Sequence, residues 1–316
     1  MLIVHVGTQK TGSSSIQHFL RENEQLLRDS GISYVSAVRE WSDHNKLARE
    51  LRNNNAATPR ADAIVAEIKS RGYDKYIISA EELFHKRVPN RLFDHLTRHL
   101  DMEVRIVSYL RRPDHLIEAL YKQRVKTGDI KPRPLRYLDE NKWECDYLTV
   151  LDAFAERFGA DHLAVRPYVR SRLKDGDVVA DFLDVTGLKM NGSPTRSMPE
   201  DNPTFSAAVS ELMGFCVRNS PIRFFELNEQ IARLDWPDIK KSGDAYNRAT
   251  RLRLLQELEP DLRAIADQYG AELWDALAFE DLREGGNFAF PSDHERAELA
   301  LQAGKAVLFA AMRLKD

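Results

Sequence analysis

The residues that most clearly suggest a chemical function lie near the start of the chain, where glycines, a lysine and a run of hydroxyl side chains follow a short apolar stretch. The two glycines permit a tight backbone path, and the amides at the start of a following helix, together with the helix dipole, attract an anion. The lysine adds a full positive charge, and the hydroxyl groups add hydrogen-bond donors. The sequence therefore predicts an anion-binding loop made of Gly7, Thr8, Lys10, Thr11, Gly12, Ser13, Ser14 and Ser15.

The order of residues in this loop differs from the ATP-binding pattern G-x-x-x-x-G-K-[ST], in which the lysine directly follows the second glycine. Here Lys10 precedes Gly12 by two positions, so its ammonium reaches a different point of a bound phosphate. The stretch K-T-G-S-S-S resembles the 5'-phosphosulfate loop of the sulfotransferases, whose donor is 3'-phosphoadenosine-5'-phosphosulfate (PAPS). The resemblance implies that Lys10 lies by the oxygen bridging phosphate and sulfate, and that Ser13, Ser14 and Ser15 hold the 5'-phosphate.

A second basic region runs from Arg105 to Arg136, with nine Lys or Arg against three Asp or Glu in a chain whose net charge is -3. Within it, a predicted strand ends at Arg111, and Pro113 begins a predicted helix. Sulfotransferases carry a similar strand, R-x-P and helix, whose arginine binds the 3'-phosphate of the donor. The resemblance assigns this role to Arg111. A guanidinium suits this task because its planar donors match phosphate oxygens in pairs.

One position of this region departs from the family pattern. Sulfotransferases carry a serine eight residues after the arginine, and this chain has Ala119 there. We expect a basic side chain of the same helix to replace the lost hydroxyl. Lys122 is the first choice because it lies one helical turn further, and the alternatives are Arg124 and Lys126.

Sulfuryl transfer also needs a residue that removes a proton from the acceptor, and two residues are candidates. Glu81 lies at the carboxyl end of a predicted strand, the edge where open α/β sheets place their sites, in an S-x-E motif that resembles bacterial members of the family. His44 lies at a predicted helix start and has an ordinary pKa near 6.5. The reaction requires no metal in this scheme, because Lys10 and the helix amides already meet the phosphosulfate charge.

The elements that must position these residues follow from the hydrophobic pattern. Short β-branched-rich stretches alternate with helical patterns, which predicts an α/β fold: an open parallel sheet with helices on both faces, the P-loop-type fold that the resemblance implies. Helical patterns alone follow Gly187, so we expect a donor-binding core over 1–190 and a mainly helical region over 191–316 that packs on it and faces the acceptor. The predicted strands are 2–6, 32–35, 76–79, 104–110 and 162–165, and the predicted helices are 13–27, 61–70, 90–99, 113–126, 205–217, 249–269 and 294–312.

The composition narrows the class of protein further. A net charge of -3 provides no global field for nucleic acid or an anionic membrane. The chain has no apolar run long enough to span a membrane and no signal-peptide pattern, so we expect a cytoplasmic protein without stable membrane insertion. The two cysteines, Cys145 and Cys216, show neither a disulfide framework nor metal-ligand spacing.

The expected partner is a small-molecule or glycan acceptor with a hydroxyl or amine group, and the second product is 3',5'-ADP. The acceptor's identity and the oligomeric state do not follow from the sequence. The segment 190–203, rich in turn residues, is a candidate acceptor-side loop. Several aromatic residues could stack on sugar rings or simply fill the core: Trp41, Trp143, Trp236, Trp274, Tyr137 and Tyr147.

Two other functions fit parts of the sequence. A nucleotide-dependent kinase uses a phosphate loop of similar architecture, but this chain lacks the G-K-[ST] order. A non-catalytic nucleotide-binding protein of the same fold would account for Ala119 as a mark of an eroded donor site. Stabilisation by 3',5'-ADP but not by ADP with magnesium would favour the sulfotransferase.

Overall fold

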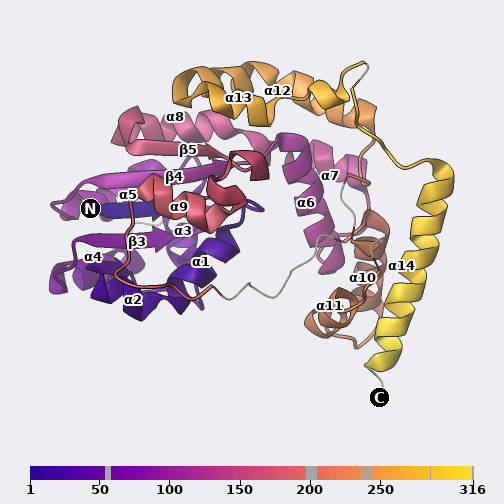
Figure 1. The fold of residues 1–316 in the computed structure, drawn as a ribbon, viewed down its shortest axis with the longest axis horizontal. Coiled ribbons are helices and arrows are strands. Elements are labelled where there is room, and N and C mark those ends of the chain that lie inside the picture. Colours follow the sequence, from indigo (N-terminus) through magenta and orange to yellow (C-terminus); the bar gives the residue numbers. More distant parts are fainter. Residues whose placement is uncertain (54–57, 197–204, 237–238, 241–242, 285, 315–316) are drawn as a thin grey trace. The chain divides into compact units, whose positions relative to one another are not determined.

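The fold contains one parallel sheet, seen in a computed structural model that describes all residues except 54–57, 197–204, 237–238, 241–242, 285 and 315–316 (Figure 1). Its five strands have the order β2-β3-β1-β4-β5, and every pairing is parallel. The α/β class with an open parallel sheet is thus confirmed. The strands are β1 (Leu2–His5), β2 (Ile32–Tyr34), β3 (Lys75–Ser79), β4 (Val104–Leu110) and β5 (Leu163–Pro167).

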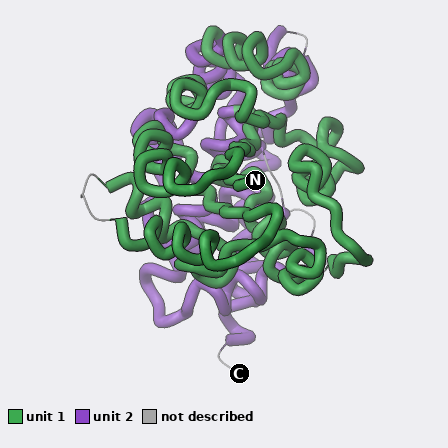
Figure 2. The backbone as a smooth tube through the Cα atoms, turned by 90° about the vertical axis from the view of Figure 1, so that its left-hand side faces the viewer, with its two compact units in different colours: residues 1–112, 146–199, 260–278 green, residues 113–145, 200–259, 279–316 purple. Residues whose placement is uncertain are grey.

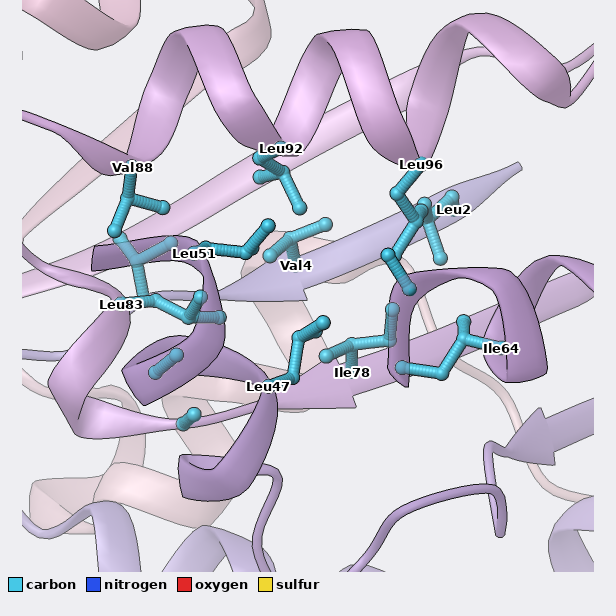
Figure 3. Close-up of a cluster of buried hydrophobic side chains, with 14 of the residues drawn as sticks. Leu2, Val4, Leu47, Leu51, Ile64, Ile78, Leu83, Val88, Leu92 and Leu96 are labelled. Atoms are coloured by element: carbon cyan, nitrogen blue, oxygen red, sulfur yellow. The ribbon is translucent and has the colours of Figure 1, made fainter. Parts of the chain in front are cut away.

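Alternation along the strands divides the apolar residues between the two faces of the sheet. On β1, Leu2 and Val4 join one buried cluster and Ile3 joins the other. The parallel register places Val4 beside Ile78 of β3, and Figure 3 shows these side chains packed beneath Leu92 and neighbouring helical residues. Both faces are buried, as parallel sheets require.

Two sets of helices supply the residues that cover these faces. The first cluster includes side chains from α3 (Asn45–Arg52), α4 (Pro59–Ser70), α5 (Val88–His95) and α8 (Tyr147–Phe158). The second includes side chains from α1 (Ser13–Glu22), α2 (Glu24–Asp29) and α9 (Val178–Thr186).

The chain divides into two compact units, coloured separately in Figure 2. Unit 1 contains the sheet and comprises residues 1–112, 146–199 and 260–278; unit 2 comprises residues 113–145, 200–259 and 279–316. The sequence predicted a single boundary near residue 190, whereas each of these two units combines three separate segments of the chain. The segment 113–145 groups with the later helices because α6 (Pro113–Lys126) packs against α10 (Ala207–Asn219).

Helices are the only regular secondary structure among the described residues of unit 2. Its apolar core joins residues of α10, α11 (Phe224–Ala232) and α14 (Asp293–Arg313), including Val209, Leu227 and Ala306. α7 (Pro134–Asn141) belongs to the same unit, and α12 (Arg248–Tyr269) passes from unit 2 into unit 1 at Pro260, before α13 (Ala271–Leu277). None of the described helices is long and apolar enough to cross a bilayer.

One difference from the predicted elements lies after the first strand. The helix expected over 13–27 is two helices, because the chain breaks at Asn23. The Asn23 side chain donates to the carbonyls of Phe19 and Thr195 and accepts from the Thr195 amide. A side chain that competes for backbone groups in this way ends a helix.

Candidate active site

The loop between β1 and α1 is shaped by close packing at two glycines. Gly12 has a φ of 79° and forms the N-cap of α1, and a Cβ there would lie 2.9 Å from Val178 Cγ1 and 3.1 Å from Tyr168 Cε2. Gly7 has a φ of 45°, and a Cβ there would lie 2.8 Å from Ser13 Oγ. Both positions therefore require glycine for its conformation and for its small size.

Two predicted ligands turn out to build the loop. The Thr8 hydroxyl donates to the backbone carbonyl of Tyr109 at 3.0 Å, and the Thr11 hydroxyl donates to the Thr8 carbonyl at 2.6 Å. Both threonines are buried. Between them Lys10 adopts a left-handed φ of 62°, a conformation that is rare for residues other than glycine. The two threonine hydroxyls therefore donate to backbone carbonyls and stabilise this turn.

Donors for an anion remain at the start of α1. Ser13 is buried, and its hydroxyl has no hydrogen-bond partner among the described residues. No side chain caps the helix at Gly12, so the first amides of α1 are available. A buried donor without a partner costs about 1–3 kcal/mol, and an anion at this position would offset that cost. Ser14 is exposed and Ser15 is half-buried.

Three charged residues meet at the carboxyl ends of three adjacent strands. Lys10 follows β1, Glu81 follows β3 at the start of the short helix η1 (Glu81–Leu83), and Arg111 follows β4. The Arg111 Nη1 donates to the Lys10 carbonyl at 3.1 Å. The Glu81 Cα lies 3.4 Å from where a Cβ of Gly7 would be. The fold thus brings together the predicted lysine, base and phosphate-binding arginine.

Burial shifts the pKa values of Lys10 and Glu81 in the directions that favour their uncharged forms. Desolvation lowers the pKa of Lys10, and the charge of Arg111 lowers it further, while Glu81 raises it. Desolvation raises the pKa of Glu81, against the opposing influence of Lys10. The two residues are therefore close enough to influence one another's charge, and each is poised nearer to neutrality than in water.

The second candidate base has a different environment. His44 is fully buried, and its Nε2 lies 2.9 Å from the Val35 carbonyl. Its Nδ1 lies 3.3 Å from the backbone nitrogen and the carbonyl of Ser79. Burial lowers the pKa of His44 to about 4. Both ring nitrogens thus contact the backbone, an arrangement that joins His44 to β3 and to Val35, directly after β2.

Lys122 belongs to unit 2 and is buried there among carboxylates. Its ammonium pairs with Glu118 at 2.7 Å and with Asp244. Arg251 pairs with the same Glu118 and with Asp114 at 2.9 Å. The predicted contact of Lys122 with a 3'-phosphate stays a prediction, and this ammonium already pairs with two acids of its own unit.

A buried polar group beneath the loop was not predicted. The Nδ1 of His5 lies 2.8 Å from Ser79 Oγ, and Gln17 Nε2 donates to the same oxygen at 3.2 Å. His5 and Ser79 are register partners on β1 and β3. The sequence did contain a signal for this group. Each of the two apolar strands ends in a polar residue, His5 or Ser79, directly before the segment that carries Lys10 or Glu81.

The aromatic candidates are divided between exposed and packed positions. Trp41 and Trp143 are exposed, with 76% and 54% of their surfaces accessible, whereas Tyr137 and Tyr147 are buried. Of the predicted acceptor-side loop 190–203, the part 197–203 lies outside the described residues. Among the residues that the structure describes, no group of His, Cys, Asp and Glu is arranged to hold a metal ion.

Comparison with known proteins adds little to this geometry. No family model matches the sequence. An uncharacterized protein of Archaeoglobus fulgidus is 31% identical over 105 residues, and the match spans 32% of this chain and only 27% of that relative. The crystal structure of a sulfotransferase from Alicyclobacillus acidocaldarius aligns with 84% of this chain and 94% of its own, at a TM-score of 0.49 and 12% identity. Matches at this level establish neither a family nor an activity.

Proposed function

We propose that this protein is a sulfotransferase that moves the sulfuryl group of PAPS to a hydroxyl or amine of a carbohydrate or other small acceptor. The observation that carries the proposal is the meeting of Lys10, Glu81 and Arg111 at the carboxyl ends of β1, β3 and β4. The loop that presents Lys10 also has the K-T-G-S-S-S order that resembles a 5'-phosphosulfate loop. The acceptor and a cytoplasmic location stay predictions from the sequence.

Each of the three residues has a distinct task in this reaction. Glu81 takes the acceptor's proton, the acceptor oxygen or nitrogen forms a bond to sulfur, and the bond from sulfur to the bridging phosphate oxygen breaks. Lys10 and the first amides of α1 stabilise the negative charge that develops on the leaving phosphate. Arg111 binds the 3'-phosphate, and 3',5'-ADP is released.

The choice of Glu81 as base rests on its surroundings. Its pKa is raised by burial, which strengthens the carboxylate as a proton acceptor. It lies against the phosphate loop at Gly7. His44, by contrast, is fully buried and contacts backbone atoms through both nitrogens, so we assign it a structural role.

Ligand-induced stabilisation tests the proposal directly. We expect 3',5'-ADP to raise the melting temperature, because a ligand that binds only the folded state stabilises it by mass action. Lys10→Met should abolish this effect, while Lys69→Met on the exposed side of α4 should retain it. Stabilisation by ADP with magnesium but not by 3',5'-ADP would support a kinase instead. Stabilisation by 3',5'-ADP without transfer of labelled sulfate to any of a panel of acceptors would support a non-catalytic binding protein.

A further inference from the structure

Unit 2 contains a cavity of about 470 Å³ that the sulfotransferase proposal does not use. One wall is a single face of α7: its lining residues recur at the i, i+3, i+4 spacing of a helix. The other wall comes from the end of α6 and the turn after it. The lining residues are Arg124, Ile130, Lys131, Arg133, Arg136, Tyr137, Glu140 and Asn141. The volume falls in the range of small-molecule sites.

The charge of this cavity is strongly positive although the chain as a whole is slightly negative. Four lining residues are cations and one is an acid. Arg136 pairs with that acid, Glu140, at 2.7 Å, and both side chains are more than half exposed, so the pair is weak. Arg124 lies 3.6 Å from Glu144. Lys131 and Arg133 form no ion pair with any of the described residues.

The two remaining cations are held on a stiff segment. Lys131-Pro132-Arg133-Pro134 alternates cations with prolines, whose rings fix the backbone angle φ. Ile130, just before it, is anchored because the Arg218 guanidinium donates to its carbonyl at 2.9 Å. Pro134 is anchored because the Tyr246 hydroxyl donates to its carbonyl at 3.1 Å. The charges are thus presented by a backbone that loses little freedom when a ligand binds.

Uncharged donors accompany the cations. The Tyr137 side chain is buried, and its hydroxyl has no hydrogen-bond partner among the residues described. Burial raises the pKa of Tyr137 to about 12, so the hydroxyl keeps its proton at neutral pH. No side chain caps the start of α7, which adds a partial positive charge beside Arg133. This buried hydroxyl has an unused hydrogen-bonding capacity, which a ligand oxygen that reached it would satisfy.

We propose that this cavity binds an acidic saccharide, whose sulfate or carboxylate groups pair with Lys131 and Arg133 while Glu140 and Asn141 hydrogen-bond to its hydroxyl groups. We favour a saccharide over a nucleotide because the lining offers Glu140 and the side-chain oxygen of Asn141 to several hydroxyl groups, of which a nucleotide has few. The saccharide's role as the acceptor, or as part of it, rests on the proposed sulfotransferase function; its binding does not.

Calorimetry on the full chain tests this binding with a disulfated, uronate-containing disaccharide as the probe and neutral lactose as the comparison. We expect the acidic probe to bind and lactose not to. The double variant Lys131→Ala/Arg133→Ala should weaken the probe's affinity by about tenfold or more, since each charge-assisted hydrogen bond contributes on that scale. The variant Arg253→Ala/Lys305→Ala removes the same charge from exposed positions of α12 and α14 and should bind the probe like the unmodified chain.

The variant Tyr137→Phe separates a ligand contact from a structural role. It deletes only the unpaired hydroxyl, so we expect severalfold weaker binding with a melting temperature that is unchanged or higher. Equal binding of lactose, equal losses in the two double variants, or tighter binding of a short oligonucleotide of matched charge would overturn the proposal. The affinity for 3',5'-ADP, measured in parallel, reports on the donor site alone, so a failure of the proposed function is seen separately.

Discussion

The guanidinium of Arg111 donates a hydrogen bond to the backbone carbonyl of Lys10 at 3.1 Å. The first residue after β4 therefore supports the loop that follows β1. The backbone of Arg111 is itself anchored, because the Tyr147 hydroxyl donates to its carbonyl at 2.7 Å. The arginine proposed to bind the 3'-phosphate also positions the lysine proposed to meet the leaving group.

We expect Arg111→Lys to weaken 3',5'-ADP binding by about tenfold or more, because lysine keeps the charge but lacks the planar guanidinium. Arg105→Lys, at the other end of β4, provides the matched control. Calorimetric titration of both variants measures the effect. Equal affinities for the two would remove Arg111 from the donor site.

Replacing Gly12 by alanine should damage the loop. An alanine there must adopt a φ of 79° and place its Cβ 2.9 Å from Val178 Cγ1, so we expect a loss of about 1–3 kcal/mol of unfolding free energy and of 3',5'-ADP binding. Gly72→Ala is the control, because a Cβ at Gly72 meets nothing within 4 Å. Urea unfolding and thermal shift report the two effects, and a Gly12→Ala variant that binds like Gly72→Ala would contradict the proposed loop.

Glu81→Gln should reduce turnover by roughly 10²-fold if the carboxylate is the base. In the unmodified chain, turnover should rise with pH through the elevated pKa of Glu81 and then level off, since only the carboxylate accepts a proton. The variant should lack this rise. A pH–rate profile that keeps the same ascending limb in Glu81→Gln would assign the base elsewhere.

The same pKa shift predicts a change in stability of definite sign. The folded-state pKa of Glu81 lies above its unfolded value, so its contribution is most favourable below the unfolded value and is lost as pH rises through the folded one. The unfolding free energy of the unmodified chain, relative to Glu81→Gln, should therefore decline as pH rises through this interval. Urea titrations at several pH values measure the difference, and a difference that grows with pH would be inconsistent with burial as the cause.

His44 should affect the stability of the fold at acidic pH and should not affect turnover. Burial lowers the pKa of His44 to about 4, below the unfolded value of about 6.5, so stability is lost as pH falls between these values, by about 1.4 kcal/mol per pH unit. His44→Gln should flatten this part of the stability curve and leave turnover within a few-fold at neutral pH. A 10²-fold loss of turnover in a folded His44→Gln variant would restore the histidine as a candidate base.

Arg251 should be important for the stability of unit 2. Its side chain is buried against Asp114 and Glu118, and removal of one partner from a buried ion-pair network costs about 3–5 kcal/mol. We expect Arg251→Leu to lose unfolding free energy on this scale, whereas Arg253→Leu, an exposed position of the same helix, should lose less than about 1 kcal/mol. Denaturant unfolding distinguishes the two variants.

The sequence predicted the sheet well because strands depend on local pattern. The strands near Leu2, Ile32, Tyr76, Val104 and Leu163 were all expected within a residue or two, since apolar runs bounded by turns are short-range signals. The first helix was predicted too long because the break at Asn23 depends on Thr195, a distant contact that no local pattern contains.

The candidate site was harder to predict from the sequence wherever a side chain can either bind a ligand or bond to another part of the chain. The hydroxyls of Thr8 and Thr11 looked like ligands, but they bond to backbone carbonyls. Lys122 lay in a basic stretch, yet its acidic partner Asp244 comes from a remote part of the chain. Such outcomes depend on which carbonyl or carboxylate the tertiary fold brings near, and this information is not present in spacing.

The internal hydrogen bonds of Thr8 and Thr11 hold the backbone of the loop between β1 and α1. Because these hydrogen bonds come from the chain itself, binding of the proposed donor should cost little conformational entropy in the turn around Lys10. Backbone order parameters of the protein without nucleotide should then be as high in this turn as in β1, in contrast to nucleotide loops that order only upon binding.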